Sequence, residues 1–270
     1  MIRPPAVAGR FYPDDPEMLR TTVDSFLQSN LKEEKIRVRA CLVPHAGYVY
    51  SGAVAGEVYR RIEIPSRVIL LGPRHFPRGA SLAILSDGAW QTPLGAAPVD
   101  HPLAEKIIGA CPSLQEDAVA HSAEHSLEVQ LPFLQRIAPT SFSFVPIVIG
   151  PAKWETLEAL GQAIAKVIAA EHEPILIIAS SDMNHYESDA MTRVKDRKAI
   201  DQILALEPKK LFDTVRDEKI SMCGYAAVVA TLVASRELEA SRAELLRYAT
   251  SGEVSGDMEE VVGYAGMVLR

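Results

Sequence analysis

The chain has 270 residues, and its 28 lysine and arginine residues against 35 aspartate and glutamate residues give a formal net charge of −7 at pH 7. With 48% hydrophobic and 23% charged residues, its composition is that of an ordinary globular protein, which excludes disordered, collagen-like and coiled-coil chains. The acidic balance and the lack of a lysine and arginine cluster argue against a nucleic-acid partner.

The sequence also predicts a location. The longest apolar-biased run, Tyr225 to Ala234, is too short to span a bilayer, and the N-terminus lacks the apolar stretch of a signal peptide. The three cysteines, Cys41, Cys111 and Cys223, are odd in number and widely spaced, which fits neither a disulfide framework nor a Cys-x-x-Cys zinc ribbon. We therefore expect a soluble protein of the reducing cytoplasm, with no membrane partner.

The first expected element is a helix that starts at Asp15, whose side chain can cap free N–H groups, with Pro16 in the first turn. After it, strand-like and helix-like segments alternate along the chain. The segments expected as strands are Ile36 to Val43, Arg67 to Leu71, Ser81 to Leu85, Phe142 to Ile149, Ile175 to Ala179, Glu244 to Ala249 and Val261 to Leu269. The segments expected as helices are Gly52 to Ile62, Leu103 to Ala110, Glu124 to Ile137, Trp154 to Ala170, 189 to 206 and 224 to 238.

These segments predict the fold class. Strands made almost wholly of Val, Ile and Leu, such as Val68 to Leu71 and Ile175 to Ile178, require a sheet that is covered by helices on both faces. No repeat, low-complexity tract or Gly/Ser linker divides the chain. We expect one α/β domain over residues 1–270, built as a three-layer α/β/α sandwich, with the last two strands pairing as an edge of the sheet.

Three of the seven histidines fall at informative places. His45, His75 and His185 each lie within a few residues of the C-terminal end of a predicted buried strand, and Asp182 precedes the last of them. In open α/β sheets, functional groups collect beyond these strand ends. Imidazole is the commonest metal ligand and the usual proton shuttle near neutral pH. The pattern predicts a mononuclear metal site or a proton-transfer site.

Cys223 is the cysteine that most favours a functional interpretation, because it lies at the start of the predicted helix 224–238. Free N–H groups and the helix dipole stabilise a thiolate there, which favours nucleophilicity or metal binding. The alternative is a small buried hydrophobic residue. Cys41, inside a strand, and Cys111, just before Pro112, are assigned to structure.

A further histidine pair, His121 and His125, has a spacing of four residues, which would place both rings on one helix face. The pair lacks the His-Glu-x-x-His order of zinc proteases. Ser122, with Glu124 close behind, fits a helix N-terminal cap followed by an acidic first turn. We expect capping, or hydrogen bonds that support the ligands, from this segment rather than direct ligation.

Several motifs occur in order along nearly the whole chain. They are Pro5-Ala-Val-Ala-Gly-Arg-Phe-Tyr-Pro13, Pro44-His-Ala-Gly-Tyr48 with Ser51-Gly52, Gly72-Pro-Arg-His75, Glu124-His-Ser-Leu-Glu128, Ser180-Ser-Asp-Met-Asn-His185, Met222-Cys-Gly224 and Tyr248-Ala-Thr-Ser-Gly252. Together they resemble the MEMO family, whose bacterial and archaeal members are also called AmmeMemoRadiSam system protein B.

The resemblance implies a fold similar to LigB-type class III extradiol dioxygenases, which are non-haem iron enzymes that cleave catechol-like rings. It implies a metal pocket formed by His45, His75 and Cys223 that holds iron or copper, with Asp182 and His185 lining it. Ring-cleaving iron enzymes use two histidines and one carboxylate, whereas the thiolate of Cys223 shifts the preference toward copper(I), zinc or a different iron electronic structure. His185 is the best candidate for a general acid or base, because imidazole exchanges protons near neutral pH.

The sequence therefore predicts a MEMO-like metal-binding protein that carries out redox or oxygen chemistry on a small molecule. Two alternatives stay open. One is a non-enzymatic module that binds a peptide or an aromatic side chain in the same pocket, with Tyr48, Tyr50 and Trp90 nearby. The other is a zinc-dependent hydrolase.

Overall fold

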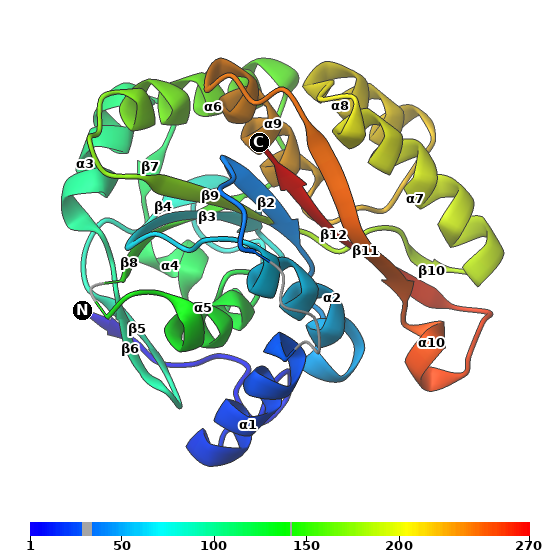
Figure 1. Cartoon of the computed structure of the whole chain (residues 1–270). Coiled ribbons are helices and arrows are strands. Elements are labelled where there is room, and N and C mark those ends of the chain that lie inside the picture. The colour runs from blue at the N-terminus through cyan, green and yellow to red at the C-terminus, as the bar shows by residue number, and fades with distance from the viewer. Residues whose placement is uncertain (29–33, 141) are drawn as a thin grey trace.

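The computed structural model describes residues 1–28, 34–140 and 142–270. Within these ranges a large mixed sheet separates two layers of helices (Figure 1). In spatial order its strands are β10 (His185–Glu187), β12 (Val261–Leu269), β2 (Ala40–Val43), β9 (Ile175–Ser180), β3 (Arg67–Pro73), β8 (Ser143–Ile149), β4 (Leu82–Ile84) and β7 (Gln115–Glu116), while β11 (Ala243–Thr250) pairs with β12. The predicted three-layer α/β/α sandwich is confirmed.

The centre of the sheet is parallel, since β2 pairs with β9, β9 with β3, and β3 with β8 in the same direction. Alternate side chains of each strand face opposite helix layers. In β3, Ile69 and Leu71 face one core, whereas Val68 and Leu70 face the other, and all four are fully buried. Burial on both faces explains why these strands read as continuous apolar runs rather than as alternating ones.

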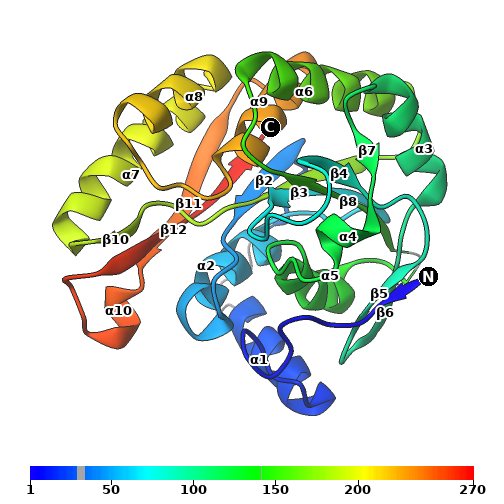
Figure 2. The same ribbon diagram turned by 180° about the vertical axis from the view of Figure 1, so that it is seen from behind.

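One helix layer covers the face that Ile69 and Leu71 enter (Figure 2). It contains α3 (His101–Ala110), α6 (Trp154–Ala169), α7 (Asp189–Leu204), α8 (Pro208–Asp217) and α9 (Tyr225–Glu237). Helix α9 lies against the sheet and is covered by α6 and α8, so most of its residues are buried. This position explains its apolar sequence.

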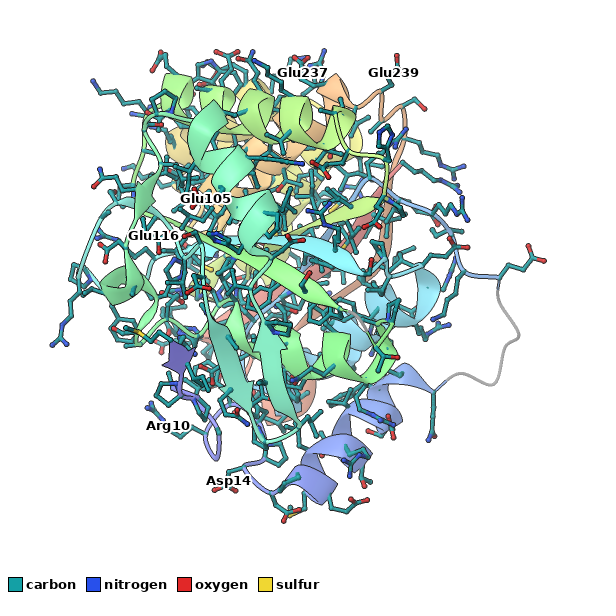
Figure 3. The ribbon with its side chains drawn as sticks, turned by 90° about the vertical axis from the view of Figure 1, so that its left-hand side faces the viewer. Arg10, Asp14, Glu105, Glu116, Glu237 and Glu239 are labelled. Atoms are coloured by element: carbon teal, nitrogen blue, oxygen red, sulfur yellow. The ribbon has the colours of Figure 1, made fainter. Side chains whose placement is uncertain are left out.

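The opposite layer covers the face that Val68 and Leu70 enter. It contains α1 (Pro16–Leu27), α2 (Tyr48–Arg61), α4 (Ala118–His121), the 3-10 helix η1 (Glu128–Gln130), α5 (Leu131–Ile137) and a small sheet of β1 (Ile2–Arg3), β5 (Ala89–Thr92) and β6 (Gly95–Pro98). A short helix, α10 (Gly252–Ser255), lies in the connection between β11 and β12. The charged residues labelled in Figure 3 are all exposed on the surface.

The predicted start of the first helix is confirmed, because Asp15 Oδ1 accepts the backbone N–H groups of Glu17 (3.0 Å) and Met18 (2.8 Å). Two boundaries differ. Helix α2 begins at Tyr48, four residues before the predicted start. The predicted strand 36–43 is shorter, because only Ala40–Val43 joins the sheet, while Ile36 forms an isolated bridge with Ile62.

The predicted helix Glu124 to Ile137 is wrong over its first half. The chain runs irregularly to η1, and α5 starts only at Leu131 with Pro132 in its first turn. A proline lacks the N–H that a continuous helix would need, and it disfavours helical geometry in the residue before it. Ser122 is not an N-cap either, since Asp117 caps the preceding helix α4 through the N–H groups of Val119 and Ala120.

The predicted pairing of the last two strands is confirmed, and β11 has β12 as its one strand partner among the described residues, but the expected edge position is wrong for β12. Strand β12 is interior, because it pairs with β11, β10 and β2. The sequence prediction also omitted α8 and the shortest elements. Among the described residues, the helices are too short or too polar to cross a membrane.

Candidate metal centre

The site forms where three neighbouring parallel strands end. His45 follows β2 by two residues, Asp182 follows β9 by two residues, and His75 follows β3 by two residues. Because β9 lies between β2 and β3, the three side chains start from adjacent strand ends at one edge of the sheet.

Cys223 reaches this edge from the residue before the N-cap of α9. The backbone N–H of Gly224 donates to Ser181 Oγ (3.0 Å), and a Cβ atom on Gly224 would lie only 2.4 Å from the carbonyl oxygen of Ser180. Glycine therefore lets this segment approach the end of β9. As a result, Cys223 Sγ lies 3.2 Å from His45 Nε2.

The structure brings all five predicted site residues together. Potential ligand atoms of His45, His75 and Cys223 lie within 4.8 Å of one another, and so do those of Asp182, His185 and Cys223. Cys223 belongs to both groups, so the two groups form one continuous cluster. Three imidazoles, a thiol and a carboxylate make a donor set that fits iron, copper or zinc.

Glu124 fixes the orientation of His75. Its carboxylate accepts the His75 backbone N–H (2.6 Å) and the His75 Nδ1–H (2.8 Å), as well as the N–H groups of His125 (2.9 Å) and Ser126 (2.8 Å). With both oxygens so engaged, Glu124 supports the cluster rather than offering a free ligand atom. Because Nδ1 donates its proton to Glu124, the Nε2 atom of His75 has a lone pair that can bind a metal ion.

His45 has a defined tautomer. Ser180 Oγ donates to the carbonyl oxygen of Ser126 (2.6 Å) and accepts a hydrogen bond from Gln130 Nε2 (3.0 Å). A hydroxyl has one proton, so Ser180 Oγ must accept from His45 Nδ1, which lies 3.0 Å away. The proton of the neutral ring is therefore on Nδ1, and Nε2 presents a lone pair toward Cys223.

His185 is held in the same way. Its Nδ1 lies 2.9 Å from the carbonyl oxygen of Ser221, which can only accept, so Nδ1 carries the proton. The backbone N–H of His185 donates to Ser221 Oγ (2.7 Å). Asn184 Oδ1 accepts from both the N–H and the hydroxyl of Ser221 (3.1 Å each), which fixes this segment beside Cys223.

A fourth histidine also lies in the cluster. The ring of His125 stacks on that of His75 with 4.4 Å between the centroids, and it lies 5.6 Å from the ring of His45. His125 had been predicted in a helical segment that caps or supports the ligands. The structure shows that Glu124 supports the His75 ring through a hydrogen bond, but the segment that carries Glu124 and His125 is irregular rather than helical. Its predicted companion His121 is elsewhere, buried against Trp90 with 5.7 Å between the ring centroids.

The electrostatics favour neutral groups in the metal-free pocket. Burial, reinforced by His75 and His125, holds the pKa of His45 well below its usual value. Burial, with the nearby carboxylate of Asp182, raises the pKa of the Cys223 thiol. Burial also raises the pKa of Asp182, against the hydrogen bond that its Oδ1 accepts from the His45 backbone N–H (2.7 Å).

Glu124 is the exception and remains ionised. Burial opposes its charge, but the hydrogen bond and electrostatic interaction with His75, together with His125 and the Ser126 N–H, lower its pKa to about 2. A permanent negative charge therefore lies behind the His75 ring.

The cluster opens into a cavity of 580 Å³. Phe11, Tyr186 and Val262 line it beside the polar residues. The aromatic residues that the sequence placed nearby are not its walls. Trp90 is fully buried, because it fills the core between the small sheet and α4. The guanidinium carbon of Arg3 lies 3.9 Å from the centroid of its ring. Tyr48 and Tyr50 line a neighbouring cavity instead.

Comparison with known proteins places the chain in a family. The sequence profile described as Memo-like protein matches residues 3–268. The chain is 41% identical over 281 residues to a MEMO1 family protein of Methanopyrus kandleri, covering 100% of this chain and 99% of the relative. It is 42% identical over 268 residues to a MEMO1 family protein of Aquifex aeolicus, covering 99% of each, and 40% identical over 270 residues to one of Methanosarcina barkeri, covering 100% of each. The chain belongs to the Memo family.

Proposed function

We propose that the chain binds one redox-active metal ion, iron or copper, through His45, His75 and Cys223, and that it carries out redox or oxygen chemistry on a small molecule in the adjoining cavity. The observation that supports this most is the tautomer of the two imidazole rings, that is, which nitrogen carries the proton. The Nδ1 atoms of His45 and His75 carry the ring protons toward Ser180 and Glu124, so each Nε2 atom keeps a lone pair that can bind an ion. Histidine ligands are typically oriented by such a second hydrogen bond.

The donor set favours a transition metal. A thiolate with two imidazoles suits copper, iron or zinc, whereas magnesium and calcium prefer oxygen ligands. A bound iron or copper ion would supply electron exchange with the molecule in the cavity. Because Cys223 is a protonated thiol in the metal-free protein, its binding to an ion releases a proton.

Asp182 and His185 are proposed to move protons. Asp182 Oδ2 lies 3.9 Å from His45 Nε2, and its raised pKa lets it accept a proton more readily than an ordinary aspartate. His185 has its Nδ1 proton bound to Ser221, so its Nε2 is the atom that can accept a proton from a molecule in the cavity. Both residues line the cavity that the molecule would enter.

The same donors suit zinc, and a zinc-loaded protein would be a hydrolase candidate. The oxygen chemistry in the proposal rests on the resemblance to extradiol dioxygenases. A peptide-binding module that needs no metal is the remaining alternative. Identification of the bound metal separates these three functions.

The test is elemental analysis of protein purified anaerobically without a metal-affinity tag, together with its absorption spectrum. We expect about one iron or copper per chain and a thiolate-to-metal charge-transfer band. Cys223→Ser should lose the band and most of the metal, and His45→Ala with His75→Ala should lose the metal while the protein still unfolds cooperatively.

Cys111→Ser is the matched control, because Cys111 is a buried thiol in the core formed by α3 and α6, away from the cluster. It should keep both the metal and the band. Metal binding at full stoichiometry in Cys223→Ser, with an unchanged spectrum, would contradict the ligand assignment. Zinc alone in the native protein would favour the hydrolase.

A further inference from the structure

Tyr186 lines the cavity at the metal cluster in a backbone conformation that no helix end explains. Among the described residues, four that are not glycine have a positive φ angle. Three of them come directly after the C-caps of α7, α8 and α9, where a left-handed residue commonly ends a helix: Leu206, Lys219 and Glu239. Tyr186, at φ 58°, lies instead in strand β10.

Both neighbours of Tyr186 are held in place, so the strained residue between them cannot relax. The backbone N–H of His185 donates to Ser221 Oγ (2.7 Å), and Lys195 Nζ donates to the carboxylate of Glu187 (2.7 Å). Strain of this kind persists only where the surroundings impose it, and it is concentrated at sites that bind ligands. We therefore looked for what the Tyr186 side chain does at the cavity.

The ring of Tyr186 is largely uncovered by the protein. It is 73% exposed although it lines the cavity, so it stands at the cavity mouth. Its ring neighbour is His185, which it meets edge to face with 5.6 Å between the centroids. The face of an aromatic ring carries partial negative charge and attracts cations. An uncovered tyrosine ring at a cavity mouth is thus suited to bind an ammonium group.

The acidic residues around the cavity favour the same kind of ligand. Asp182 lines the cavity, and the ionised carboxylate of Glu124 lies behind the ring of His75. A nearby ammonium group favours the ionised form of Asp182. Among the described residues that line the cavity, none is a lysine or an arginine that could pair with a carboxylate or phosphate group.

The segment that leads into one wall of the cavity is also acidic. Val262 lines the cavity and pairs with His185, the neighbour of Tyr186. The exposed residues shortly before it include three acids, Asp257, Glu259 and Glu260. Negative charge gathered beside an entrance raises the local concentration of cationic ligands.

We infer that Tyr186 is a specificity-determining residue and that the substrate is an amine, whose polar head lies at the metal cluster and whose ammonium group lies on the Tyr186 ring. The inference rests on the proposed metal function, since it places the head group at the cluster. Because the Tyr186 ring is exposed, water and salt screen the repulsion between the ammonium group and the metal ion.

The test uses three hydroxamic acids, whose shared head group chelates transition-metal ions. Their tails are similar in length but differ in charge: γ-aminobutyrohydroxamic acid carries an ammonium group, valerohydroxamic acid is neutral, and succinic monohydroxamic acid carries a carboxylate. Each is titrated into metal-loaded protein, and the dissociation constant is followed through the metal absorption band. The amine should bind about two- to fivefold more tightly than the neutral acid, and the carboxylate should bind most weakly.

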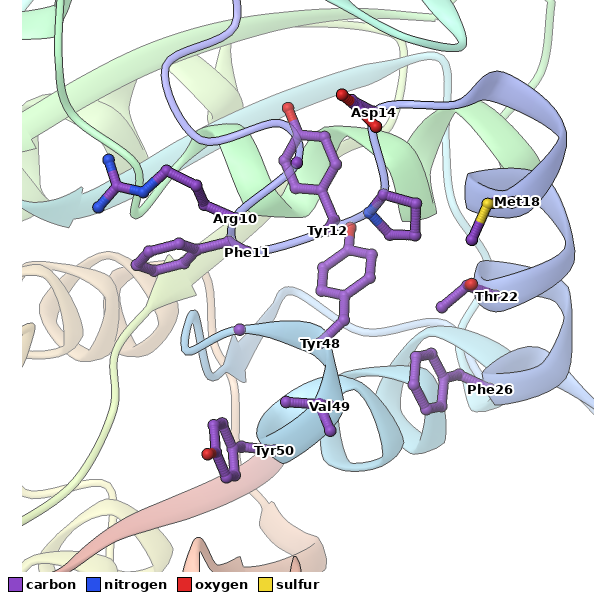
Figure 4. A pocket seen from close by; sticks show the side chains of 13 residues that line it. Arg10, Phe11, Tyr12, Asp14, Met18, Thr22, Phe26, Tyr48, Val49 and Tyr50 are labelled. Atoms are coloured by element: carbon purple, nitrogen blue, oxygen red, sulfur yellow. The ribbon is translucent and has the colours of Figure 1, made fainter. Parts of the chain in front are cut away.

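Two variants of Tyr186 separate the ring face from the strained backbone. Tyr186→Leu keeps an apolar side chain at the same position but removes the ring, so it should lose the preference for the amine and keep its affinity for the neutral acid. Tyr186→Phe keeps the ring face and should retain the preference. Tyr50→Leu is the matched control, because Tyr50 is also partly exposed (40%) but lines the neighbouring cavity instead (Figure 4). It should keep the native order of affinities.

Equal affinity for the three acids, or tightest binding of the carboxylate, would overturn the inference while leaving the metal function intact, since the head group still binds. A preference for the amine that Tyr186→Leu retains would overturn it too, because another residue would then select the ligand. Failure of every acid to bind, with no metal retained, would overturn the inference and the proposed function together.

Discussion

The Nε2 atom of His45 lies 3.2 Å from the Sγ atom of Cys223, although the two residues are 178 positions apart in the chain. Since the His45 ring carries its proton on Nδ1, the thiol is the donor in this contact in the metal-free protein. Under the proposed function, an ion held by both atoms would take the place of that single proton. Metal binding and proton release would therefore be coupled at this pair.

This coupling predicts the pH dependence of metal affinity. Burial keeps the Cys223 thiol protonated and the His45 ring neutral, so above neutral pH one proton leaves for each ion bound. We expect the apparent dissociation constant for the ion to fall about tenfold for each unit of pH increase between about pH 7 and 8. Competition with a chelator of known affinity measures this slope. Cys223→Ser should flatten it, and an unchanged slope in that variant would assign the proton to another group.

Glu124→Gln should weaken the proposed metal binding while leaving His45, His75 and Cys223 in place. Glutamine keeps the shape of the side chain but loses the negative charge that fixes the Nδ1 proton of His75. Loss of such a supporting carboxylate costs about 10- to 100-fold in metal affinity. Glu116→Gln is the control, since that carboxylate accepts a backbone N–H from Ser86 and does not line the cavity at the cluster. Equal affinity in both variants would show that the His75 ring is held by other contacts.

Glu124 also predicts acid sensitivity of the fold. Its pKa is about 2 in the folded protein against an ordinary value of 4.5. A lowered carboxyl pKa stabilises the fold above about pH 4.5, and this stabilisation is lost as the pH falls toward 2. Its full size is about 3 kcal/mol, because one pKa unit corresponds to about 1.4 kcal/mol. Urea unfolding at several pH values should show a smaller loss in Glu124→Gln than in the native chain, and parallel losses would disprove the assignment.

Glu128 should be a large contributor to stability, because it anchors the N-terminal segment. Its buried carboxylate accepts the Arg3 guanidinium (2.6 Å), the backbone N–H groups of Ala6 (2.8 Å) and Val7 (3.0 Å), and the Tyr12 hydroxyl (2.6 Å). Glu128→Gln leaves the buried charge of Arg3 without its counter-charge, which costs about 3–5 kcal/mol. Denaturant unfolding measures this loss.

The Glu128→Gln variant should also become sensitive to trypsin at the exposed Arg10, since the segment that carries Phe11 and Tyr12 is released. Glu63→Gln provides the comparison, because its ion pair with Arg37 is solvent-exposed and should contribute less than about 1 kcal/mol. If the two variants lose similar stability, the buried network is not an anchor.

Tyr186 occupies a strained backbone conformation at the metal pocket. Its φ angle is 58°, its ring is 73% exposed, and it sits at the irregularity between the two residues of β10 that pair with β12. Glycine tolerates this conformation at no steric cost, so Tyr186→Gly should raise the free energy of unfolding by up to about 1 kcal/mol. Lys219→Gly, at φ 52° and outside the pocket, should show a similar gain in thermal unfolding. A loss of stability in Tyr186→Gly alone would mean that its ring packs on the protein.

The sequence predicts that the candidate site residues follow buried strands, because those strands carry local signals. Parallel strands buried on both faces are rich in Val, Ile and Leu, so the ends of β2, β3 and β9 can be located to within a few residues. His45, His75 and Asp182 come directly after those ends, and neighbouring parallel strands bring such positions together. The positions of these three residues follow from the order of the strands, so they can be predicted from the sequence.

The supporting contacts are harder to predict, because they depend on irregular backbone. Glu124 and His75 are 49 positions apart, and no pattern pairs them. The apolar residues of the 124–137 segment have helical periodicity, so the sequence predicts a helix there. The irregular backbone that places His125 beside His75 could not be predicted from that pattern. Pro132 was the available signal, since a proline favours the first turn of a helix and so places the helix start at Leu131.

The interior position of β12 has a consequence for how the protein is made. β12 pairs with β11 on one side and with β2 on the other, and its first two residues pair with β10, which begins at His185. β2 and β10 are synthesised long before β12, so this part of the sheet cannot close until β12 itself has been synthesised. Contacts between segments so distant in sequence form slowly. The pairing of β12 beside β2 is therefore a late step of folding, which follows synthesis of the segments that carry His45, His75 and Cys223.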